Sequence, residues 1–408
     1  MNLSDALALD RADSLAHRRT AFSLPDGIIY LDGNSLGALP KAVIERTARV
    51  VSEEWGRDLI TSWNKHDWID LPRRVGDRIA PLIGAAPGTV IAADSTSINI
   101  FKLLAVALGR RQSRRVILTE EGNFPTDVYM AKGIAGLLRQ GHAVRAVPAD
   151  GLADALHGDV AVVLVTEVNY RTGARLDMKT LTDKVHTAGA LIIWDLAHSA
   201  GALPVDLAGA GADFAIGCGY KYLNGGPGAP AFAYVAPPHL MGLRQPLSGW
   251  LGHAAPFDFA ADYRPADGID ALRVGTPPVL SMSALDAALE MFSGVDLNAV
   301  KRKADALFDL FTAEVAARCP EFELLTPTDP ARRGTQVSLR HPEAYAVMQA
   351  LIARGVIGDF RQPDIMRFGL TPLYLGFADA FRASEILAEV MASREWDRPE
   401  FKQRAKVV

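Results

Sequence analysis

Short apolar runs alternate with helical patterns through much of this chain, and this alternation constrains its fold more than any other feature. Runs of strand length lie at 90–94, 115–120, 143–147, 160–168, 191–195 and 212–217. Between them, segments such as 97–109 and 178–189 carry apolar residues at intervals of three and four. Alternating strands and helices are typical of an α/β domain with a mostly parallel sheet. We expect this larger domain to cover residues 51–284.

The pattern changes beyond the Pro277-Pro278 pair. Long helical segments follow at 281–292 and 300–319, then two or three short strands and a last helix near 379–393. We therefore expect a smaller α+β domain over 285–408, with N-terminal helices in 1–50 packed against it. The first 22 residues predict an amphipathic helix, because charges interrupt their apolar positions and no signal-peptide core is present.

Composition and charge exclude several classes of protein. The net charge of −4 and pI near 6.2 give no electrostatic footprint for nucleic acid or an anionic membrane surface. No apolar stretch is long enough to span a membrane. Cys218 and Cys319, the two cysteines, argue against a disulfide scaffold or a structural zinc site and fit a reducing cytoplasm. We expect a cytoplasmic two-domain enzyme without a metal site.

A carboxylate and a lysine follow two of the expected strands. Asp195 ends the run 191–195, and Lys221 comes 26 residues later in the Gly-rich segment GCGYKYLNGGPG. Ligands of parallel sheets bind at the carboxyl ends of the strands. A lysine forms the Schiff base of pyridoxal phosphate, and an aspartate keeps the pyridinium nitrogen protonated so that the ring acts as an electron sink. Alone, either residue is more often a surface charge or a turn former; together, in this setting, they favour this cofactor.

A phosphate site is expected where the helix after the run 90–94 begins. Ser95, Thr96 and Ser97 stand there, and free backbone N–H groups, the helix dipole and hydroxyl donors converge on an anion at such a position. The triplet is equally compatible with an ordinary helix N-cap. The lysine and aspartate downstream favour the phosphate.

A series of motifs then resembles the kynureninase family over essentially the whole chain. In order they are LDGNSLG (31–37), SWNKHDWIDLP (62–72), NFPTD (123–127), VNYRTG (168–173), DLAHSAG (195–201), GYKYLNGGPG (219–228), GWLGH (249–253) and GTPP (275–278). Class V aminotransferase-like enzymes share two of these loosely; NFPTD, GWLGH and the N-terminal motifs are more specific. The resemblance implies the aspartate aminotransferase-type fold and a homodimer with active sites at the subunit interface. It also implies hydrolysis of L-kynurenine to anthranilate and L-alanine in tryptophan catabolism, the kynurenine pathway that also serves NAD biosynthesis.

The resemblance also implies a cofactor site, residue by residue. The expected contacts are Thr96 and Ser97 at the phosphate, Phe124 on one ring face, Asp127 at the ring edge, Thr172 at the cofactor's border, Asp195 at the pyridinium nitrogen, His198 near the ring hydroxyl, and Tyr220 at the phosphate beside Lys221. Trp250 and Thr276 would come from the neighbouring subunit. Singly, Phe124 or Trp250 is as compatible with core packing; the complete set favours the cofactor.

Substrate contacts follow from the same resemblance. Arg367 matches the arginine that binds the substrate α-carboxylate, an anion suited to a guanidinium fork. The alternation in IMRFGL predicts that Arg367 lies on a strand, where its charge needs a partner. Arg361 is the alternative residue for binding the α-carboxylate. His66, between two tryptophans, is either a contact for the aryl end of the substrate or a surface histidine. Thr276, where animal-type relatives have asparagine, predicts a preference for kynurenine over 3-hydroxykynurenine.

The expected mechanism divides the chemistry among three residues: Lys221 moves the α-proton, Asp195 keeps the ring charged, and Tyr220 protonates Cβ after Cβ–Cγ cleavage. Three other classes compete. A cysteine desulfurase or selenocysteine lyase needs a nucleophilic cysteine ahead of the carboxylate-binding arginine, and 355–367 contains none. An aminotransferase has no use for NFPTD and GWLGH. A cofactor-dependent regulator ordinarily carries a DNA-binding module, for which 408 residues leave no room.

Overall fold

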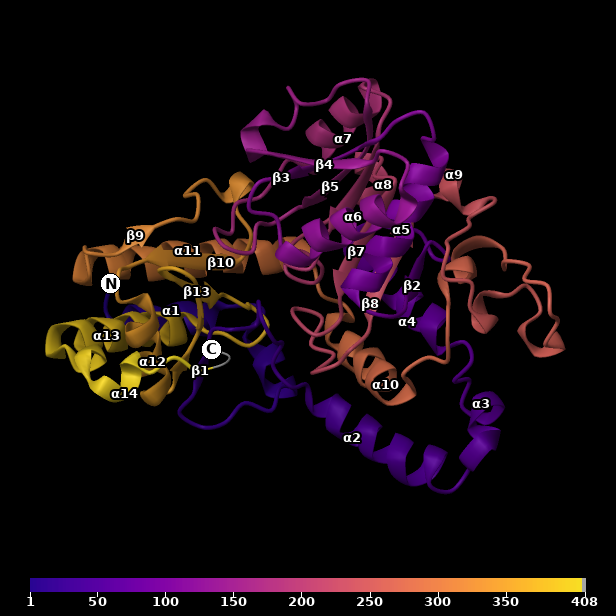
Figure 1. The fold of residues 1–408 in the computed structure, drawn as a ribbon. Helices are drawn as coiled ribbons and strands as arrows, with labels where there is room; N and C mark the ends of the chain where they lie inside the picture. The colour runs from indigo at the N-terminus through magenta and orange to yellow at the C-terminus, as the bar shows by residue number, and fades with distance from the viewer. Residues whose placement is uncertain (406–408) are drawn as a thin grey trace.

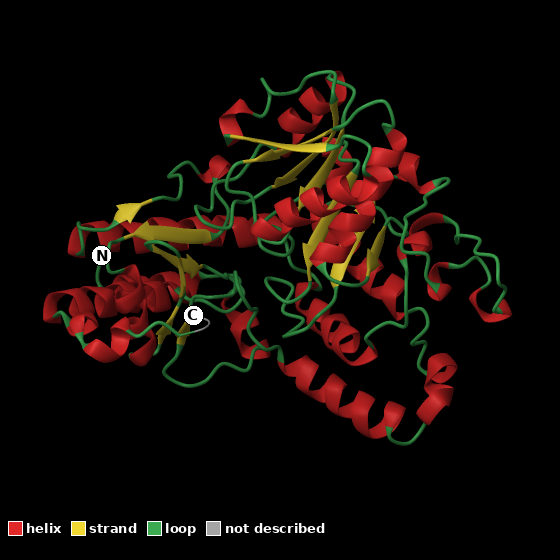
Figure 2. Ribbon diagram, in the orientation of Figure 1, coloured by secondary structure: helices red, strands yellow, loops and turns green. Residues whose placement is uncertain are grey.

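The computed structural model describes residues 1–405 and shows two parts side by side (Figure 1). The larger part, on the right, is built on a twisted sheet with helices on both faces, as the secondary-structure colours of Figure 2 show. The smaller part, on the left, contains a short antiparallel sheet and holds the N-terminus. No helix in this described range is long and apolar enough to cross a lipid bilayer.

The large sheet has seven strands in the order β2-β8-β7-β6-β5-β3-β4. Their bounds are β2 (Val90–Ala92), β3 (Val116–Glu120), β4 (Ala143–Val147), β5 (Val160–Thr166), β6 (Leu191–Asp195), β7 (Phe214–Cys218) and β8 (Ala231–Val235). Strands β3 to β7 run parallel to one another, whereas β8 is antiparallel to both β7 and β2. The mostly parallel α/β sheet is therefore confirmed. The run that forms β8 was not among the six expected, since the Gly- and Pro-rich residues before it indicate a loop.

Helices cover both faces of this sheet because its strands are apolar on both sides. In β6, Ile193 packs into the core formed with α5 and α6, whereas Ile192 and Trp194 pack on the opposite face, with α4, α7 and α10. The helices of this part are α4 (Leu71–Ile79), α5 (Thr96–Arg110), α6 (Pro125–Leu138), α7 (Met178–Thr187), α8 (Leu207–Ala210), α9 (Pro237–Leu240) and α10 (Val279–Ala288).

The smaller part is a four-stranded antiparallel sheet, ordered β12-β13-β10-β9, packed against helices. The strands are β9 (Glu323–Leu324), β10 (Gln336–Arg340), β12 (Asp359–Arg361) and β13 (Ile365–Gly369), and the helices are α11 (Leu297–Arg318), α12 (Ala344–Ala353), α13 (Phe377–Ser393) and α14 (Pro399–Lys402). Its core includes Phe311 of α11 and Phe368 of β13, whose ring centroids are 5.2 Å apart.

The N-terminal segment contacts both parts. Helix α1 (Leu3–Ala12) packs on α13, and β1 (Ile29–Tyr30) pairs in parallel with β11 (Val356–Ile357). Asp10 accepts the Phe377 and Ala378 N–H groups at 2.6 and 3.1 Å, so an anion caps the start of α13. Helix α2 (Lys41–Arg49) instead packs on α10, and the short α3 (Ser62–Lys65) follows it. The domain boundaries at 50 and 284 stay our proposal.

Candidate active site

The parallel strands bring several expected site residues to one edge of the large sheet. Lys221 follows β7, Asp195 ends β6, and Asp127 lies in the first turn of α6, which follows β3. Since β3, β5, β6 and β7 are parallel neighbours, their carboxyl ends share this edge. Thr96 is at the same edge, because β2 and β7 both run antiparallel to β8 between them.

The turn that carries Lys221 is supported by the LDGNSLG motif. The Gly37 N–H donates to the Tyr220 carbonyl at 2.8 Å. A Cβ atom at Gly37 would lie 2.2 Å from the Lys221 carbonyl oxygen, so a side chain there would clash with backbone. Within the turn, Asn224 adopts a φ of 57° and donates to the Tyr222 carbonyl at 2.8 Å. The N-terminal segment therefore helps to set the position of the lysine.

The Lys221 amine lies among an imidazole and two aromatic rings. Its Nζ is 3.1 Å from His198 Nε2, 5.8 Å from the centroid of Phe124 and 5.9 Å from that of Tyr220. The ring distances are those of cation–π contacts. His198 is buried, and burial, followed by the charges of Lys221 and Arg367, holds its pKa well below the ordinary value. Lys221 thus faces a neutral histidine.

Three buried carboxyl groups lie at this edge: Asp195, Asp127 and Glu120. The Ala197 N–H donates to Asp195 Oδ1 at 2.7 Å, but no group within residues 1–405 hydrogen-bonds Asp127 Oδ2 or Glu120 Oε1. Burial raises the pKa of all three, to about 7 for Glu120, while Lys221 lowers the pKa of both aspartates. Buried carboxylate oxygens are normally hydrogen-bonded, so these two oxygens indicate that a donor is missing from the site. The protonated nitrogen of a bound pyridine ring would supply both an N–H donor and a positive charge.

Helix α5 begins with the half-buried Thr96 and Ser97, and its N-cap Ser95 accepts the Ile98 N–H at 3.4 Å. Amide groups of a first turn are free to bind an anion. The loop before the helix is held by Lys102, a fully buried lysine that donates to the Asp94 carboxylate and, at 2.6 Å, to the Leu272 carbonyl. The start of α5 therefore has the free amide and hydroxyl groups that a phosphate site would need, and the phosphate contact of Thr96 and Ser97 stays a prediction.

Arg367 lies on β13 with 1% of its surface exposed and has the buried partner that its strand position requires. It donates to Asp359 from Nε at 2.7 Å and also from Nη2, to Ser35 Oγ at 2.9 Å, and to the Tyr170 carbonyl at 2.6 Å. Arg361 reaches the same Asp359 carboxylate at 2.8 Å. The structure therefore brings both candidate arginines into one cluster.

This arginine cluster carries a net positive charge near neutral pH. Asp359 keeps a lowered pKa because Arg367 and Arg361 oppose the effect of its burial. Asp32 has its pKa raised to about 7 by burial and by the Asp359 charge. Two guanidinium groups then face one full carboxylate charge and a second, partly protonated carboxyl. The excess of positive charge in this cluster favours an anionic ligand.

The VNYRTG loop joins the lysine edge to the arginine cluster. Asn169 Oδ1 accepts the Thr172 N–H at 3.1 Å and the Thr172 hydroxyl at 3.3 Å. The Tyr170 ring packs edge-on against Phe124, with centroids 5.2 Å apart, and its carbonyl accepts from Arg367. Thr172 thus lies in the loop that supports the Phe124 ring.

Three expected site residues are not brought to Lys221 within one chain. His66 follows α3, at the lower right of Figure 1, and its Nε2 contacts Asp58 at 2.8 Å. The His66 imidazole is thus engaged by Asp58 within the chain, and its contact with the aryl end of a substrate stays a prediction. Trp250 stacks on Phe259 with centroids 6.3 Å apart, and both Trp250 and Thr276 are exposed.

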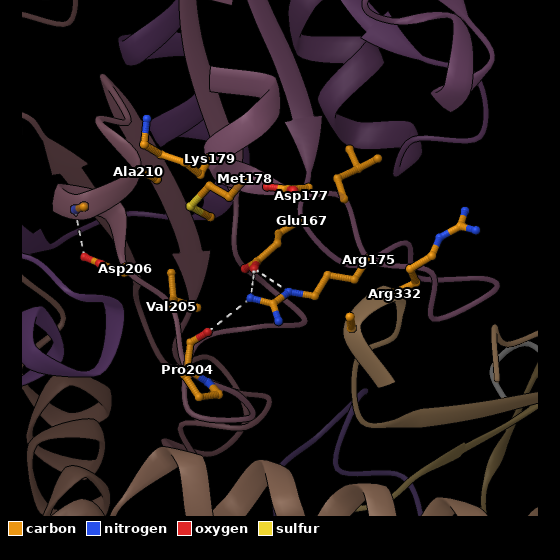
Figure 3. Close-up of a pocket in the computed structure, with 13 residues that line it drawn as sticks. Glu167, Arg175, Asp177, Met178, Lys179, Pro204, Val205, Asp206, Ala210 and Arg332 are labelled. Atoms are coloured by element: carbon orange, nitrogen blue, oxygen red, sulfur yellow. Dashed lines mark hydrogen bonds and ion pairs between the residues drawn. The ribbon is translucent and has the colours of Figure 1, made fainter. Parts of the chain in front are cut away.

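A cavity of about 810 Å³ lies beside this edge, between α7, α8 and the residues before β10 (Figure 3). Arg175 extends along it and donates to the Glu167 carboxylate at 2.9 Å and to the Pro204 carbonyl at 3.2 Å. Its lining contains none of the expected site residues. We therefore place the candidate active site at Lys221 rather than in this cavity.

The residues at the lysine edge fit pyridoxal 5′-phosphate. Lys221 offers an amine to the aldehyde, Asp195 and the free Asp127 oxygen offer acceptors to the ring nitrogen, Phe124 offers a ring face, and the start of α5 offers a phosphate cradle. Together with the mostly parallel sheet, these groups define a PLP-dependent enzyme of the aspartate aminotransferase fold, and PLP is its cofactor.

Comparison with solved structures agrees with this class. A cysteine desulfurase from Escherichia coli is 20% identical, with a TM-score of 0.75 over 93% of this chain and 99% of its own. A cysteine desulfurase from Thermococcus onnurineus is 18% identical, with a TM-score of 0.79 over 92% of this chain and 98% of its own. Likenesses at this identity concern the fold.

Sequence comparison gives the family. The model of the kynureninase C-terminal domain matches residues 300–387. A curated kynureninase from Burkholderia pseudomallei is 53% identical and one from Pseudomonas fluorescens is 51% identical, each over 99% of this chain and 99% of its own length. The chain belongs to the kynureninase family.

Five residues of the site were not found by sequence reasoning: Asp32, Ser35, Glu120, Asp359 and Gln336. Three of them had a signal, since Asp32 and Ser35 lie within the LDGNSLG motif and Asp359 lies two residues before the candidate Arg361. Glu120 ends a recognised strand, as Asp195 does. Gln336 had no local signal, because its partner His198 is 138 residues away in the chain.

Proposed function

We propose that this protein hydrolyses L-kynurenine to anthranilate and L-alanine, with pyridoxal phosphate as cofactor. The observation that carries the proposal is the 53% identity, over 99% of both chains, to a relative named kynureninase. The lysine edge and the arginine cluster support it, because one suits the cofactor and the other an α-carboxylate. The reaction belongs to tryptophan degradation.

The substrate α-carboxylate binds at Arg367 in this proposal. Asp359 engages Nε and Nη2 of that guanidinium, Ser35 the second N–H of Nη2, and the Tyr170 carbonyl one N–H of Nη1. The remaining Nη1 N–H is therefore the donor that receives the substrate carboxylate. Arg361 adds a second positive charge at the more exposed side of the cluster. The amino group of the bound substrate is thereby directed towards Lys221.

Bound PLP supplies an electron sink that makes the substrate Cα proton and the Cβ–Cγ bond labile. Asp195 holds the proton on the ring nitrogen, and Lys221 moves the Cα proton. Water then adds to the γ-carbonyl carbon, and cleavage of the Cβ–Cγ bond releases anthranilate. Tyr220, whose pKa is raised chiefly by burial, remains protonated and gives its proton to Cβ. Return of the Cα proton by Lys221 then completes alanine.

A homodimer completes the site in this proposal, with Trp250 and Thr276 reaching the neighbouring subunit. Its support is an exposed aromatic cluster: Trp250, Phe257 and Phe259 are 40, 61 and 77% exposed. Exposed apolar groups gathered in this way are typical of protein interfaces. His66 reaches a substrate only if it, too, acts across that interface.

Kynurenine is the preferred substrate in this proposal, because Thr276 lacks the amide that would pair a 3-hydroxyl group. Comparing kcat/KM for the two substrates tests this preference. We place the enzyme in the cytoplasm, a location supported by two buried, free cysteines.

Purified protein with PLP and L-kynurenine should produce fluorescent anthranilate and an equal amount of alanine. The 2-oxo acid of kynurenine, formed without anthranilate or alanine, would indicate an aminotransferase. Sulfide release from cysteine would favour a desulfurase, the class of the structural neighbours. That class needs an accessible thiolate, whereas Cys218 and Cys319 are buried and burial raises the pKa of both thiols.

A further inference from the structure

Gln336 links the small sheet to the catalytic lysine through His198. It is the first residue of β10, with 1% of its surface exposed. Its Oε1 lies 3.1 Å from His198 Nδ1, and its Nε2 donates to the Tyr170 carbonyl at 3.0 Å and to Ser338 Oγ at 3.1 Å. Every polar atom of this side chain is therefore engaged.

These partners determine which way the amide of Gln336 faces. The Tyr170 oxygen is a carbonyl and only accepts, so the amide nitrogen must be on its side. Oε1 then faces His198 and accepts a proton from Nδ1–H. In a neutral imidazole the other nitrogen carries no proton. His198 Nε2 thus presents a lone pair to Lys221 Nζ, 3.1 Å away.

The same carbonyl connects Gln336 with the arginine cluster. Arg367 donates to the Tyr170 oxygen at 2.6 Å, and Ser338, the other acceptor of Gln336, pairs with Arg367 across the β10–β13 ladder. The Tyr170 carbonyl therefore accepts hydrogen bonds from Gln336 of β10 and from Arg367 of β13. A displacement of Arg367 would alter the hydrogen bond that sets the direction of the Gln336 amide.

We propose that Gln336 is a positioning residue that holds His198 as the Nδ1–H tautomer, so that the Lys221 amine keeps its lone pair for the substrate Cα proton. With this tautomer, Nε2 accepts one N–H of the free lysine, and the lysine lone pair takes the proton from Cα. The other tautomer would donate Nε2–H to that lone pair and occupy it. The proposal deepens, and rests on, the proposed kynurenine hydrolysis.

The direct test is the tautomer of His198 in the holoenzyme, read from ¹⁵N chemical shifts of histidine-labelled protein. The His198 signals are identified by their loss in His198→Gln. We expect wild type to show a protonated Nδ1 and a bare Nε2, and Gln336→Met, which has a similar shape but no amide, to lose that preference. A protonated Nε2 in wild type, or an unchanged tautomer in Gln336→Met, would overturn the proposal. This readout does not depend on kynurenine turnover, so it fails independently of the proposed function.

Kinetics provide the second test. Gln336→Met should lower kcat about 100-fold, the lower end of the range of a general-base contribution, with a larger isotope effect for Cα-deuterated kynurenine and an unchanged cofactor spectrum. Gln349→Met, the same change on α12 away from the site, should behave as wild type. Equal losses in both variants, or normal turnover in Gln336→Met, would refute the positioning role.

Gln336→Glu keeps an acceptor for Nδ1–H and serves if the methionine variant does not fold. The charged groups that act on His198 are the cationic Lys221, Arg367 and Arg361, and the Tyr222 ring, which burial keeps protonated, packs edge-on against the imidazole. A new carboxylate would offset these cations and favour the imidazolium, which donates to the lysine lone pair. The acidic limb of the kcat profile should therefore move to higher pH; a profile identical to wild type would contradict the proposal.

Discussion

Asp359 binds Arg367 with both carboxylate oxygens, inside a sheet where neither side chain reaches solvent. A buried guanidinium without an anion is strongly unfavourable, so this aspartate makes the arginine possible at that place. Because the pair is already neutral, the net charge offered to a substrate carboxylate comes from Arg361 and from the protonation of Asp32.

The first prediction separates the two arginines. Arg367→Lys removes the planar fork and should raise KM for L-kynurenine by about 10- to 100-fold, as the loss of one charge-assisted hydrogen bond of about 1.5–3 kcal/mol implies. Arg361→Lys is the matched variant, in the same cluster but more exposed, and should change KM less. A larger effect at Arg361 would transfer the carboxylate site to it.

A second prediction concerns the cofactor lysine. Borohydride reduction of the holoenzyme followed by peptide mapping should place the pyridoxyl group on Lys221, which has His198 and Phe124 around its amine. Lys102 is unsuitable because it is fully buried and bound to Asp94. A pyridoxyl group on Lys102 or Lys65 would overturn the site.

Third, Asp195→Asn should retain the cofactor and lose most of the activity. The change keeps the shape but removes the anion that holds the ring nitrogen protonated. A loss of about 3 kcal/mol of transition-state stabilisation corresponds to roughly a hundredfold lower kcat. Absorbance titration measures cofactor binding separately from turnover, and near-normal kcat would rule out this role.

The fourth prediction tests the dimer. Lys221→Ala and Trp250→Ala proteins, each of low activity, should regain about a quarter of wild-type activity when mixed one to one and allowed to exchange subunits, because one site in each hybrid receives neither change. Exchange is followed with differently labelled chains. Complete exchange without recovery would place Trp250 in the site of its own chain.

The fifth prediction follows from Asp32. Its pKa in the folded protein, about 7, is above the ordinary 3.8, so the folded state binds more protons between these values. The free energy of unfolding should therefore fall as pH rises from about 4 to about 7, by about 1.4 kcal/mol for each unit of pKa shift. Asp32→Asn should reduce this slope in urea unfolding by the part that Asp32 contributes, while Glu120, whose pKa is also raised to about 7, keeps its own part. Asp26→Asn, at an exposed position, is the control and should keep the wild-type slope.

Local sequence determined the features that depend on neighbouring residues. The apolar runs predicted strands β2, β3, β5, β6 and β7, because continuous apolar segments of this length are stable when covered on both faces, and the run 143–147 predicted the edge strand β4. Ser95 predicted the start of α5, since its side chain caps the helix three residues on. Asp195 and Lys221 were found because strand ends and Gly-rich turns are visible in short segments.

Tertiary structure decided the contacts between distant segments. The antiparallel place of β8, the Asp359 partner of Arg367, the support of Lys221 by Gly37 and the Gln336–His198 bond arise only when separate elements pack together. The same holds for His66: its motif predicted a substrate contact but could not predict that the folded chain places its imidazole against Asp58. A hydrogen bond between residues 138 apart depends on the path of the whole chain, and no local pattern of residue types carries that information.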